Sequence, residues 1–280
     1  MEKSIKKYFP VFVLPTLVAF TLFFLIPFLL GIYLSFCNFT TITDAKFIGI
    51  SNYLKIFQDA TFFHALWYTA LFTVVSVITI NVFAFAVALL LTKGIRGTNL
   101  FRTVFFMPNL IGGIVLGYIW QLIINGILLH FDKTLTYSSS YGFWGLVILM
   151  NWQQIGYMMI IYIAGIQSIP GELLEAARMD GATNGQILKN VTLPMVMPSI
   201  TICTFLTMTN SFKLFDQNLA LTAGNPSNKS ELLALNIFNT FYGRTGWEGV
   251  GQAKAVIFFL LVALIALVQL NITRRKEVQQ

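Results

Sequence analysis

The sequence predicts an all-α membrane protein whose chain crosses the bilayer six times. Hydrophobic residues make up 56% of the 280 residues, charged residues make up 10%, and the mean hydropathy is +0.75. A soluble domain carries roughly 25% charged residues, so this chain lacks the polar residues to cover a water-exposed surface. Several apolar runs reach the roughly 20 residues that a helix needs to cross the hydrocarbon core, and basic residues flank these runs.

The net charge of +7 raises the possibility of a nucleic-acid partner. The basic residues lie at the ends of apolar runs instead of in one patch, which favours contact with membrane lipid and argues against nucleic acid. Cys37 and Cys203 lack the spacing of metal ligands, and we expect both to be small apolar residues of the interior, without a disulfide. His64 and His130 are isolated, so no metal site is predicted.

The first predicted span covers residues 9–36 and follows three lysines. It is too long for a signal peptide and lacks a small-residue cleavage site, so we predict an uncleaved transmembrane helix. Pro15 and Pro27 are expected to kink it. Residues 37–64 form a polar external connection, in which a turn at Gly49 precedes a short surface helix.

The second predicted span covers residues 66–91, and the third covers residues 101–124 with a bend at Pro108. Asn81 and Gln121 are lone polar residues within these spans, and we expect them to form hydrogen bonds between helices. Small residues on the third span predict close approach of another helix. These residues are Gly112, Gly113 and Gly117.

The fourth predicted span covers residues 143–166, the fifth covers residues 194–215 and the sixth covers residues 253–271. Residues 216–251 between the last two are rich in Gly, Asn and Thr, and the prediction treats them as a long connection. An even number of spans places both termini on the same side of the membrane.

Basic residues decide the predicted orientation. Eleven of the 18 Lys and Arg residues fall on the side of the termini, namely Lys3, Lys6, Lys7, Lys93, Arg96, Arg102, Arg178, Lys189, Arg274, Arg275 and Lys276. The other seven fall on the opposite side, namely Lys46, Lys55, Lys133, Lys213, Lys229, Arg244 and Lys254. Because positive residues are enriched on the cytoplasmic side, both termini are predicted to be cytoplasmic. We divide the chain into residues 1–65, with the first helix and its external connection, and a core of residues 66–280.

Residues 175–194, EAARMDGATNGQILKNVTLP, form a polar segment between two long apolar spans. Three good helix formers open it, Gly181 allows a turn, and Pro194 suits the start of the next helix. We predict two short helices at an angle, outside the bilayer. Glu175 is expected in the first turn of the first helix, where a carboxylate is favourable. An ordinary polar loop is the alternative.

The spacing within this segment resembles the signature of permease subunits in binding-protein-dependent ABC importers. Glu175-Ala176-Ala177 is followed after three residues by Gly181 and after nine more by Val191-Thr-Leu-Pro194, with Val where that family has Ile. Further motifs resemble carbohydrate-uptake permeases of the maltose-transporter type. They are Phe12-Val-Leu-Pro15, Ile32-Tyr-Leu-Ser-Phe36, Asn52-Tyr53, Leu100-Phe-Arg102 ahead of Pro108, Gly165-Ile-Gln-Ser-Ile-Pro170 and Phe212-Lys-Leu-Phe-Asp216.

This resemblance implies a type I ABC importer permease fold with a cytoplasmic coupling helix, within residues 170–194, and the first permease of a pseudo-symmetric pair. It also implies a second related permease, two copies of a cytoplasmic ATPase that binds ATP and Mg, and an extracellular sugar-binding protein, all at a bacterial plasma membrane. The chain itself is then no enzyme and carries no cofactor. The sequence agrees, because it contains no Gly-Lys dipeptide and hence no P-loop.

The resemblance assigns ATPase coupling to residues of the polar segment, namely Glu175, Ala176, Ala177, Asp180, Gly181, Leu193 and Pro194. Two small alanines would allow close docking into a cleft of the ATPase, and Gly181 would set the angle between the two short helices. Glu172, Arg178 and Asp180 either form charged contacts at that interface or belong to a solvated face.

Polar residues within spans are costly unless they are paired or face a cavity, and two clusters of them predict a solute site. The clusters lie in the outer parts of the fourth and fifth spans and comprise Trp152, Gln153, Tyr157, Asn210, Phe212, Lys213 and Asp216, with Asn151 and Gln154 beside them. Amides could bind sugar hydroxyls, and aromatic rings could stack on a pyranose. The alternatives are interfacial anchoring of the aromatic residues and a simple Lys213–Asp216 ion pair.

The predicted function is that of a permease subunit for carbohydrate, by preference an oligosaccharide, in an ATP-driven importer that works by alternating access. Three alternatives remain open. A permease for a non-sugar solute of the same importer class should show a charged cavity. An ATP-independent secondary transporter would usually need more spans or an inverted repeat, and a structural scaffold would not need the polar clusters.

Overall fold

The structure, a computed structural model, describes residues 2–274. It contains two compact units. The first unit holds the chain up to Ala60 together with Ile237–Leu260, and the second holds Thr61–Asn236 and the residues from Leu261 onward. Arg275 and Lys276, on which the predicted orientation partly depends, lie outside the described residues.

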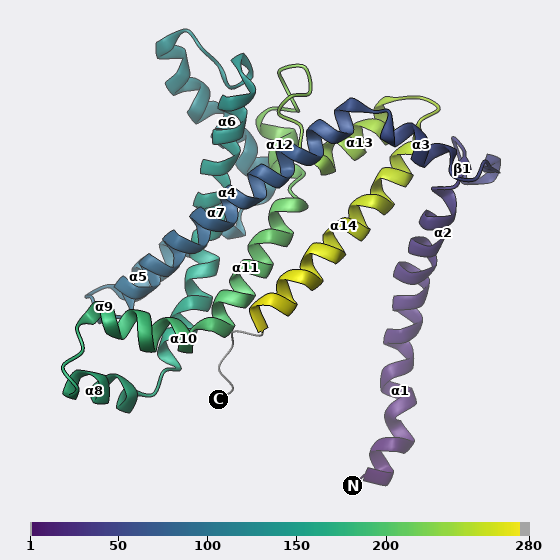
Figure 1. The fold of residues 1–280 in the computed structure, drawn as a ribbon. Coiled ribbons are helices and arrows are strands. Elements are labelled where there is room, and N and C mark those ends of the chain that lie inside the picture. The colour runs from purple at the N-terminus through teal and green to yellow at the C-terminus, as the bar shows by residue number, and fades with distance from the viewer. Residues whose placement is uncertain (1, 275–280) are drawn as a thin grey trace. The chain divides into compact units, whose positions relative to one another are not determined.

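A long apolar helix opens the first unit, as predicted. α1 (Glu2–Phe20) continues through a π-helical turn (Thr21–Leu25) into α2 (Ile26–Leu34), which Figure 1 shows in purple. Pro15 lies inside α1. Pro27 is the second residue of α2, directly after the π-helical turn, and its missing N–H removes one bond from the continuous helical ladder.

A hairpin and a short helix follow α2. β1 (Cys37–Asn38) pairs antiparallel with β2 (Lys46–Phe47), across a 3-10 turn (Ile42–Asp44). Strands of two residues are too short to show an alternating pattern, so the sequence analysis missed them. Gly49 turns the chain with φ of +65°, and α3 (Ser51–Phe57) follows, as predicted.

Three helices pass from one unit into the other along the chain. They are α4 (Ala60–Leu91), α13 (Leu233–Gly243) and α14 (Glu248–Arg274). Lys254, which was counted among the basic residues of the outer side, lies in the second turn of α14 and is fully buried. Its burial was not predicted, because a sequence window cannot show the partner that allows a lysine to be buried.

The core of the second unit lies between α4, α7 (Ser139–Gln167) and α11 (Met197–Phe212). α5 (Thr98–Phe106) packs against α7, and α6 (Gly113–Leu128) packs against α12, whose bounds are Asp216–Leu221. Among the described residues, five helices are long and apolar enough to cross a membrane, or six if a bent helix pair counts as one span. The described fold therefore agrees with the predicted all-α, six-span class.

The bounds of the third predicted span were wrong. The chain does not form one bent helix over residues 101–124, because α5 ends at Phe106, a 3-10 turn covers Met107–Leu110 and α6 begins only at Gly113. Pro108 lacks a backbone N–H, and extended backbone at Gly112 (φ −60°, ψ 140°) separates the two helices.

The fifth predicted span is also more broken than expected. Its bent helix pair consists of Asn184–Met195 and Met197–Phe212, and the angle between the two is 69°. The backbone leaves helical geometry at Val196 (φ −89°, ψ 0°), and Pro198 occupies the first turn of α11. Pro194 therefore lies within the helical turn before the bend, α10 (Leu193–Met195), and not at the head of the span.

The connection at residues 216–251 contains two helices, α12 and α13, which the sequence analysis did not predict. Polar side chains of this connection form hydrogen bonds with buried backbone groups. Asn218 is fully buried, donates to the carbonyl of Ser230 at 2.8 Å and accepts from the amide of Leu232 at 2.8 Å. The polar composition did not reveal these helices, because the Asn and Thr side chains here bind buried backbone groups instead of facing solvent.

Lone polar residues form hydrogen bonds between helices, as predicted. Tyr162 of α7 donates to Oδ1 of Asn81 of α4 at 2.7 Å, and the Asn81 amide reaches Oγ1 of Thr207 of α11 at 3.4 Å. Gln121 of α6 donates to the carbonyl of Leu221 of α12 at 3.0 Å. These bonds connect helices that apolar packing alone would allow to slide.

Replacing Tyr162 with phenylalanine should destabilise the second unit modestly. The change removes the bond to Asn81 and costs about 0.6–1 kcal/mol, the range for one side-chain hydrogen bond between membrane helices. A melting curve of the purified chain in detergent checks this result. Tyr242→Phe, at a tyrosine that is 73% exposed, is the control and should leave the melting temperature unchanged. Equal melting temperatures for the wild type and Tyr162→Phe would contradict the assigned bond.

The predicted small face on the third span is confirmed for two of its three glycines. A Cβ atom on Gly113 would lie 2.7 Å from Cβ of Asp216, and one on Gly117 would lie 2.6 Å from Cβ of Ala220. A Cβ atom on Gly112 would meet nothing within 4 Å, so this glycine is not part of the close contact. Cys37 and Cys203 are both buried free thiols.

Candidate functional site

The polar segment forms two short helices joined by a glycine turn, as predicted. α8 spans Gly171–Met179 and α9 spans Asn184–Ile187. Gly181 has φ of +77°, a conformation that favours glycine, and its N–H donates to the carbonyl of Arg178 at 3.0 Å. A π-helical turn (Leu188–Thr192) then leads to α10.

A capping box fixes the start of α9. The amide of Gln186 donates to Oγ1 of Thr183 at 3.4 Å, and the amide of Thr183 donates to Oε1 of Gln186 at 2.7 Å. The first turn of α8 holds Glu172, whereas Glu175 is the fifth residue of that helix. The expected position of Glu175 in the first turn was therefore wrong, because the helix begins four residues earlier than the three helix formers indicated.

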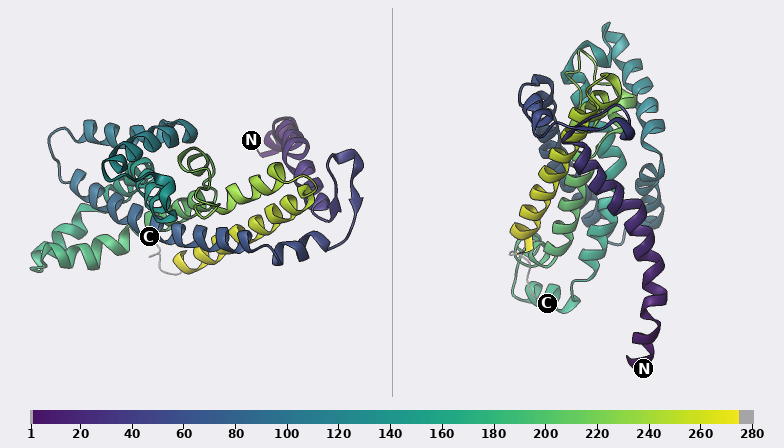
Figure 2. Two further views of the ribbon diagram at one scale, coloured as in Figure 1. Left: turned by 90° about the horizontal axis from the view of Figure 1, so that it is seen from above. Right: turned by 90° about the vertical axis from the view of Figure 1, so that its right-hand side faces the viewer.

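α8 projects from one end of the second unit, at the opposite end from the outer tip of α6 (Figures 1 and 2). Two of its apolar side chains are exposed, Met179 at 87% and Leu173 at 44%, whereas Leu174 packs against the core. Of the residues assigned to coupling, Ala177, Leu193 and Pro194 are half-buried, and the others are exposed, namely Glu175, Ala176, Asp180 and Gly181. The segment thus presents a mixed apolar and charged surface suited to a partner protein.

A polar pocket of about 280 Å³ lies in the second unit between α7 and the residues around the end of α11. Four of the seven predicted solute-binding residues line it, namely Gln153, Asn210, Lys213 and Asp216. Gln154 and Gln217 also line it. Four neutral amide side chains, one positive and one negative side chain, and several apolar side chains therefore surround the pocket.

Hydrogen bonds between amides organise the wall of the pocket. Gln217 donates to Oε1 of Gln153 at 2.9 Å, and Gln153 donates to the carbonyl of Ile111 at 3.4 Å. Asn210 donates to Oε1 of Gln154 at a longer 3.4 Å. An amide can both donate and accept, as a sugar hydroxyl does, so this wall offers neutral hydrogen bonding.

Lys213 and Asp216 are both exposed, and in the part of the chain that the structure describes they form no ion pair with each other. Both line the pocket. The simple ion pair that the sequence allowed is therefore not what positions these two side chains.

The three predicted aromatic residues do not line the pocket. Trp152 is 44% exposed and packs its ring against Trp120 at 5.6 Å. Tyr157 packs against Phe106 at 6.4 Å, and Phe212 is buried. On a helix, successive residues lie about 100° apart, so Trp152 lies about 200° around α7 from Gln154 and faces away from the pocket.

Gln217 is the pocket residue that the sequence analysis missed. It falls in the stretch that was treated as a connection, and the structure places it in the first turn of α12. Lys213 and Leu214 lie before that helix begins, so helical spacing does not relate them to Gln217. Its position directly after Asp216, a residue already assigned to the solute site, is the signal that could have indicated it.

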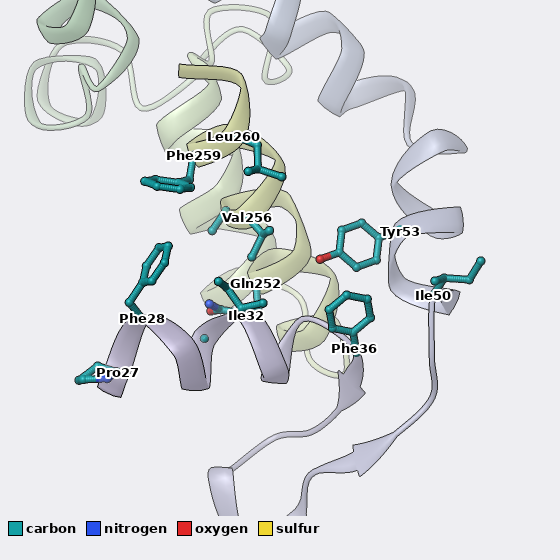
Figure 3. A pocket seen from close by; sticks show the side chains of 12 residues that line it. Pro27, Phe28, Ile32, Phe36, Ile50, Tyr53, Gln252, Val256, Phe259 and Leu260 are labelled. Atoms are coloured by element: carbon teal, nitrogen blue, oxygen red, sulfur yellow. The ribbon is translucent and has the colours of Figure 1, made fainter. Parts of the chain in front are cut away.

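A larger groove of about 750 Å³ lies in the first unit, but its lining is apolar (Figure 3). Phe28 of α2 and Phe259 of α14 pack edge to face across it, with ring centroids 5.0 Å apart. Of its lining side chains, only those of Tyr53 and Gln252 carry polar atoms, and the Tyr53 hydroxyl bonds to Oγ of Ser35 at 2.7 Å. The groove suits hydrocarbon and offers little to a polar solute.

Apolar helices that can cross a membrane, a polar pocket between two of them and an exposed helix pair at one end define a membrane permease. The chain belongs to the family of binding-protein-dependent transport system inner membrane components, whose family model matches residues 67–278. It is accordingly a multi-pass membrane protein of a transport system. Within the described residues, no group of three or more His, Cys, Asp or Glu is placed to hold a metal ion.

Related proteins cover nearly the whole chain. A probable starch degradation products transport system permease protein, AmyD of Thermoanaerobacterium thermosulfurigenes, is 43% identical over 96% of this chain and 94% of its own length. The trehalose/maltose transport system permease protein MalF of Thermococcus litoralis is 27% identical over 94% of this chain and 92% of its own length. Because the alignment with AmyD covers 96% of this chain, the similarity extends to the first span and to the connection that follows it.

The fold matches that of solved importers. A chain of a bacterial ABC transporter involved in the import of the acidic polysaccharide alginate superposes with a TM-score of 0.82, at 19% identity, over 98% of each chain. A chain of the MetNI methionine ABC transporter superposes with a TM-score of 0.57, at 21% identity, over 76% of this chain and 95% of that one. The predicted fold, that of a type I ABC importer permease, is confirmed.

Proposed function

We propose that this chain is the membrane-spanning permease subunit of an ATP-driven, binding-protein-dependent importer of carbohydrate. The exposed segment from α8 to α9 carries the proposal, because a transporter that hydrolysed ATP in the same chain would have no need of a projecting partner surface. ATP and Mg would bind to two copies of a separate cytoplasmic ATPase. A second related permease would complete the pathway, with this chain as the first of the pair.

An extracellular sugar-binding protein would deliver the solute to the outer face. The solved alginate transporter occurs in complex with an alginate pentasaccharide-bound periplasmic protein, which supports a partner of this kind. With the α8 end in the cytoplasm, both termini are cytoplasmic and the pocket faces the outer half of a bacterial plasma membrane. The positive-inside excess supports this orientation.

The mechanism we propose is alternating access. ATP binding closes the ATPase pair, the coupling segment moves with it, and the helices open outward to accept sugar. Hydrolysis then resets them inward. Glu175, Ala176, Ala177, Asp180 and Gly181 would form the docking surface. Leu193 and Pro194 would pass the movement to α11, to which the half-buried α10 leads directly.

A neutral oligosaccharide is the proposed solute, and the relatives named for starch degradation products and for trehalose and maltose support it. The pocket supports it too, because Gln153, Gln154 and Asn210 offer neutral amides, beside Lys213 and Asp216 of opposite charge. A phosphate or a charged amino acid would instead call for an excess of one sign. Trp152 and Tyr157 would act only by stacking outside the described pocket, and Phe212, which is buried, would act only through packing.

Uptake by cells tests the proposal. Disruption of the gene should abolish uptake of radiolabelled maltotriose, and the intact gene supplied in trans should restore it. A panel of trehalose, phosphate and methionine, measured in parallel, distinguishes sugar from non-sugar transport. Unchanged maltotriose and trehalose uptake in the disrupted strain, with loss of phosphate or methionine uptake, would favour a non-sugar importer of the same class.

Asn210→Ala should weaken sugar capture. Its amide lines the pocket, and the long 3.4 Å bond to Gln154 leaves it available to a ligand. One neutral hydrogen bond contributes roughly 0.5–1.5 kcal/mol, so KM for uptake should rise about two- to tenfold. The adjacent Thr209→Val is the matched control, because the Thr209 hydroxyl bonds to the carbonyl of Phe205 on its own helix. Equal KM values for the two variants would contradict a ligand role for Asn210.

A further inference from the structure

A fully buried lysine lies in the outer part of α14, within the first unit. Nζ of Lys254 donates to Oδ2 of Asp59 at 2.8 Å and to Oγ1 of Thr240 at 2.8 Å, and none of the Lys254 side chain is exposed. An ammonium group can be buried only when it is paired and hydrogen-bonded. The three residues come from three separate parts of the chain, directly before α4, on α13 and on α14.

Asp59 also faces a cation at the surface. Arg244 approaches Oδ2 of Asp59 at 3.7 Å, its side chain is 37% exposed, and its guanidinium lies 5.2 Å from the ring centroid of Trp247. The buried pair is therefore short and shielded, whereas the Arg244 contact is long and reaches solvent. The two cations provide a natural comparison, because they share one carboxylate oxygen.

The buried pair lies next to the places where the chain passes from one compact unit to the other. These passages follow Ala60, Asn236 and Leu260. Asp59 directly precedes the first passage, Thr240 lies one helical turn beyond the second, and Lys254 lies within two turns of the third. One set of hydrogen bonds, wholly inside the first unit, thus ties all three connecting segments together.

We propose that Asp59 and Lys254 are positioning residues for transport, which keep the three connecting segments in one fixed arrangement. α13 and α14 continue as helix through their passages and α4 begins at its passage, so a movement of the connecting segments is transmitted along all three helices. The pair makes those three helices respond together. The inference rests on the proposed transport function and goes beyond it, because it assigns a role to residues far from the pocket and the coupling segment.

Stability alone is a weak explanation of the pair. Replacing a buried ion pair as a whole by apolar residues is often neutral or stabilising, while removal of one partner leaves an uncompensated buried charge. What a short, directional pair does supply is a defined geometry, which apolar side chains of similar size do not impose. The double apolar variant therefore separates geometry from stability.

The test compares the wild type with a double apolar variant, in which one chain carries both Asp59→Leu and Lys254→Met. The complex is purified with its partner subunits, reconstituted in lipid vesicles and assayed for uptake of radiolabelled maltotriose. We expect the melting temperature to stay close to that of the wild type, the maximal uptake rate to fall about tenfold or more, and KM to remain unchanged. The charge-swapped chain, Asp59→Lys with Lys254→Asp, should recover part of the lost rate. Arg244→Met is the matched control and should transport at the wild-type rate.

Two results would overturn the inference. Wild-type uptake by the double apolar variant would show that the pair is dispensable, and a loss of uptake that only parallels a loss of folded protein would reduce the pair to packing. The wild-type complex is assayed beside the variants. Absent wild-type uptake contradicts the proposed function, which keeps that failure distinct from a failure of this inference.

Discussion

Gly156→Ala is expected to prevent stable folding of the second unit. A Cβ atom at this position of α7 would overlap the carbonyl oxygen of Phe105 in α5, which is backbone and cannot rotate away. The two helices would have to separate, and the lost packing should cost at least about 3 kcal/mol, the upper part of the usual range for overpacked interiors. The expected result is a much lower yield of monodisperse protein and a lower melting temperature in detergent.

Gly126→Ala is the matched control for this variant. Gly126 lies within α6, and a Cβ atom there would meet nothing within 4 Å. Alanine in a helix interior is favoured over glycine by about 1 kcal/mol, so this variant should be as stable as the wild type or more so. Equal yields and melting temperatures for Gly156→Ala and Gly126→Ala would contradict the close crossing of α5 and α7.

Gly181→Asp is expected to abolish transport while much of the folded protein remains. Gly181 has φ of +77°, where an L-residue is strained by roughly 1–2 kcal/mol, and Asp is among the residues that tolerate this region best. No atom lies within 4 Å of the added Cβ, so the helices behind it are not disturbed. The variant should instead change the angle between α8 and α9 and place a negative charge on the proposed docking surface.

Uptake of radiolabelled maltotriose by complemented cells, with the amount of chain in the membrane measured in parallel, checks this prediction. Gly185→Asp is the matched control, because Gly185 also has no neighbour within 4 Å and lies four residues further along the same exposed segment. An acidic residue in the first turn of α9 is favourable to the helix. Uptake at background for Gly181→Asp and near wild type for Gly185→Asp is expected. Normal uptake by Gly181→Asp would argue against the docking role of this turn.

Features encoded by local sequence were predicted well. Apolar length gave the membrane class and most spans, since a helix must reach across the hydrocarbon core whatever its neighbours are. The turn at Gly181 followed from the one residue type that adopts positive φ freely. The interhelical bonds of Asn81 and Gln121 followed from the cost of an unpaired amide in an apolar environment.

Features that depend on contacts between residues far apart in the chain were not predicted. The burial of Lys254 was not predicted, because its partner Asp59 lies far away in the chain. Gln217 was missed, because α12 is held by packing on α6 and has little helical signal of its own. The separation of α5 from α6 was read as a bend within one helix, because Pro108 in a sequence is compatible with a kink or a break.

The most direct test of the account is ATP-dependent uptake by the purified complex. This chain, tagged and isolated from its native membrane with the subunits that accompany it, is reconstituted in sealed vesicles and supplied with radiolabelled maltotriose and the sugar-binding protein. The account predicts that sugar accumulates only when ATP is present on the side of α8, and that Gly181→Asp abolishes this accumulation. Sugar uptake by this chain alone, in vesicles without ATP, would contradict the account and indicate a secondary transporter.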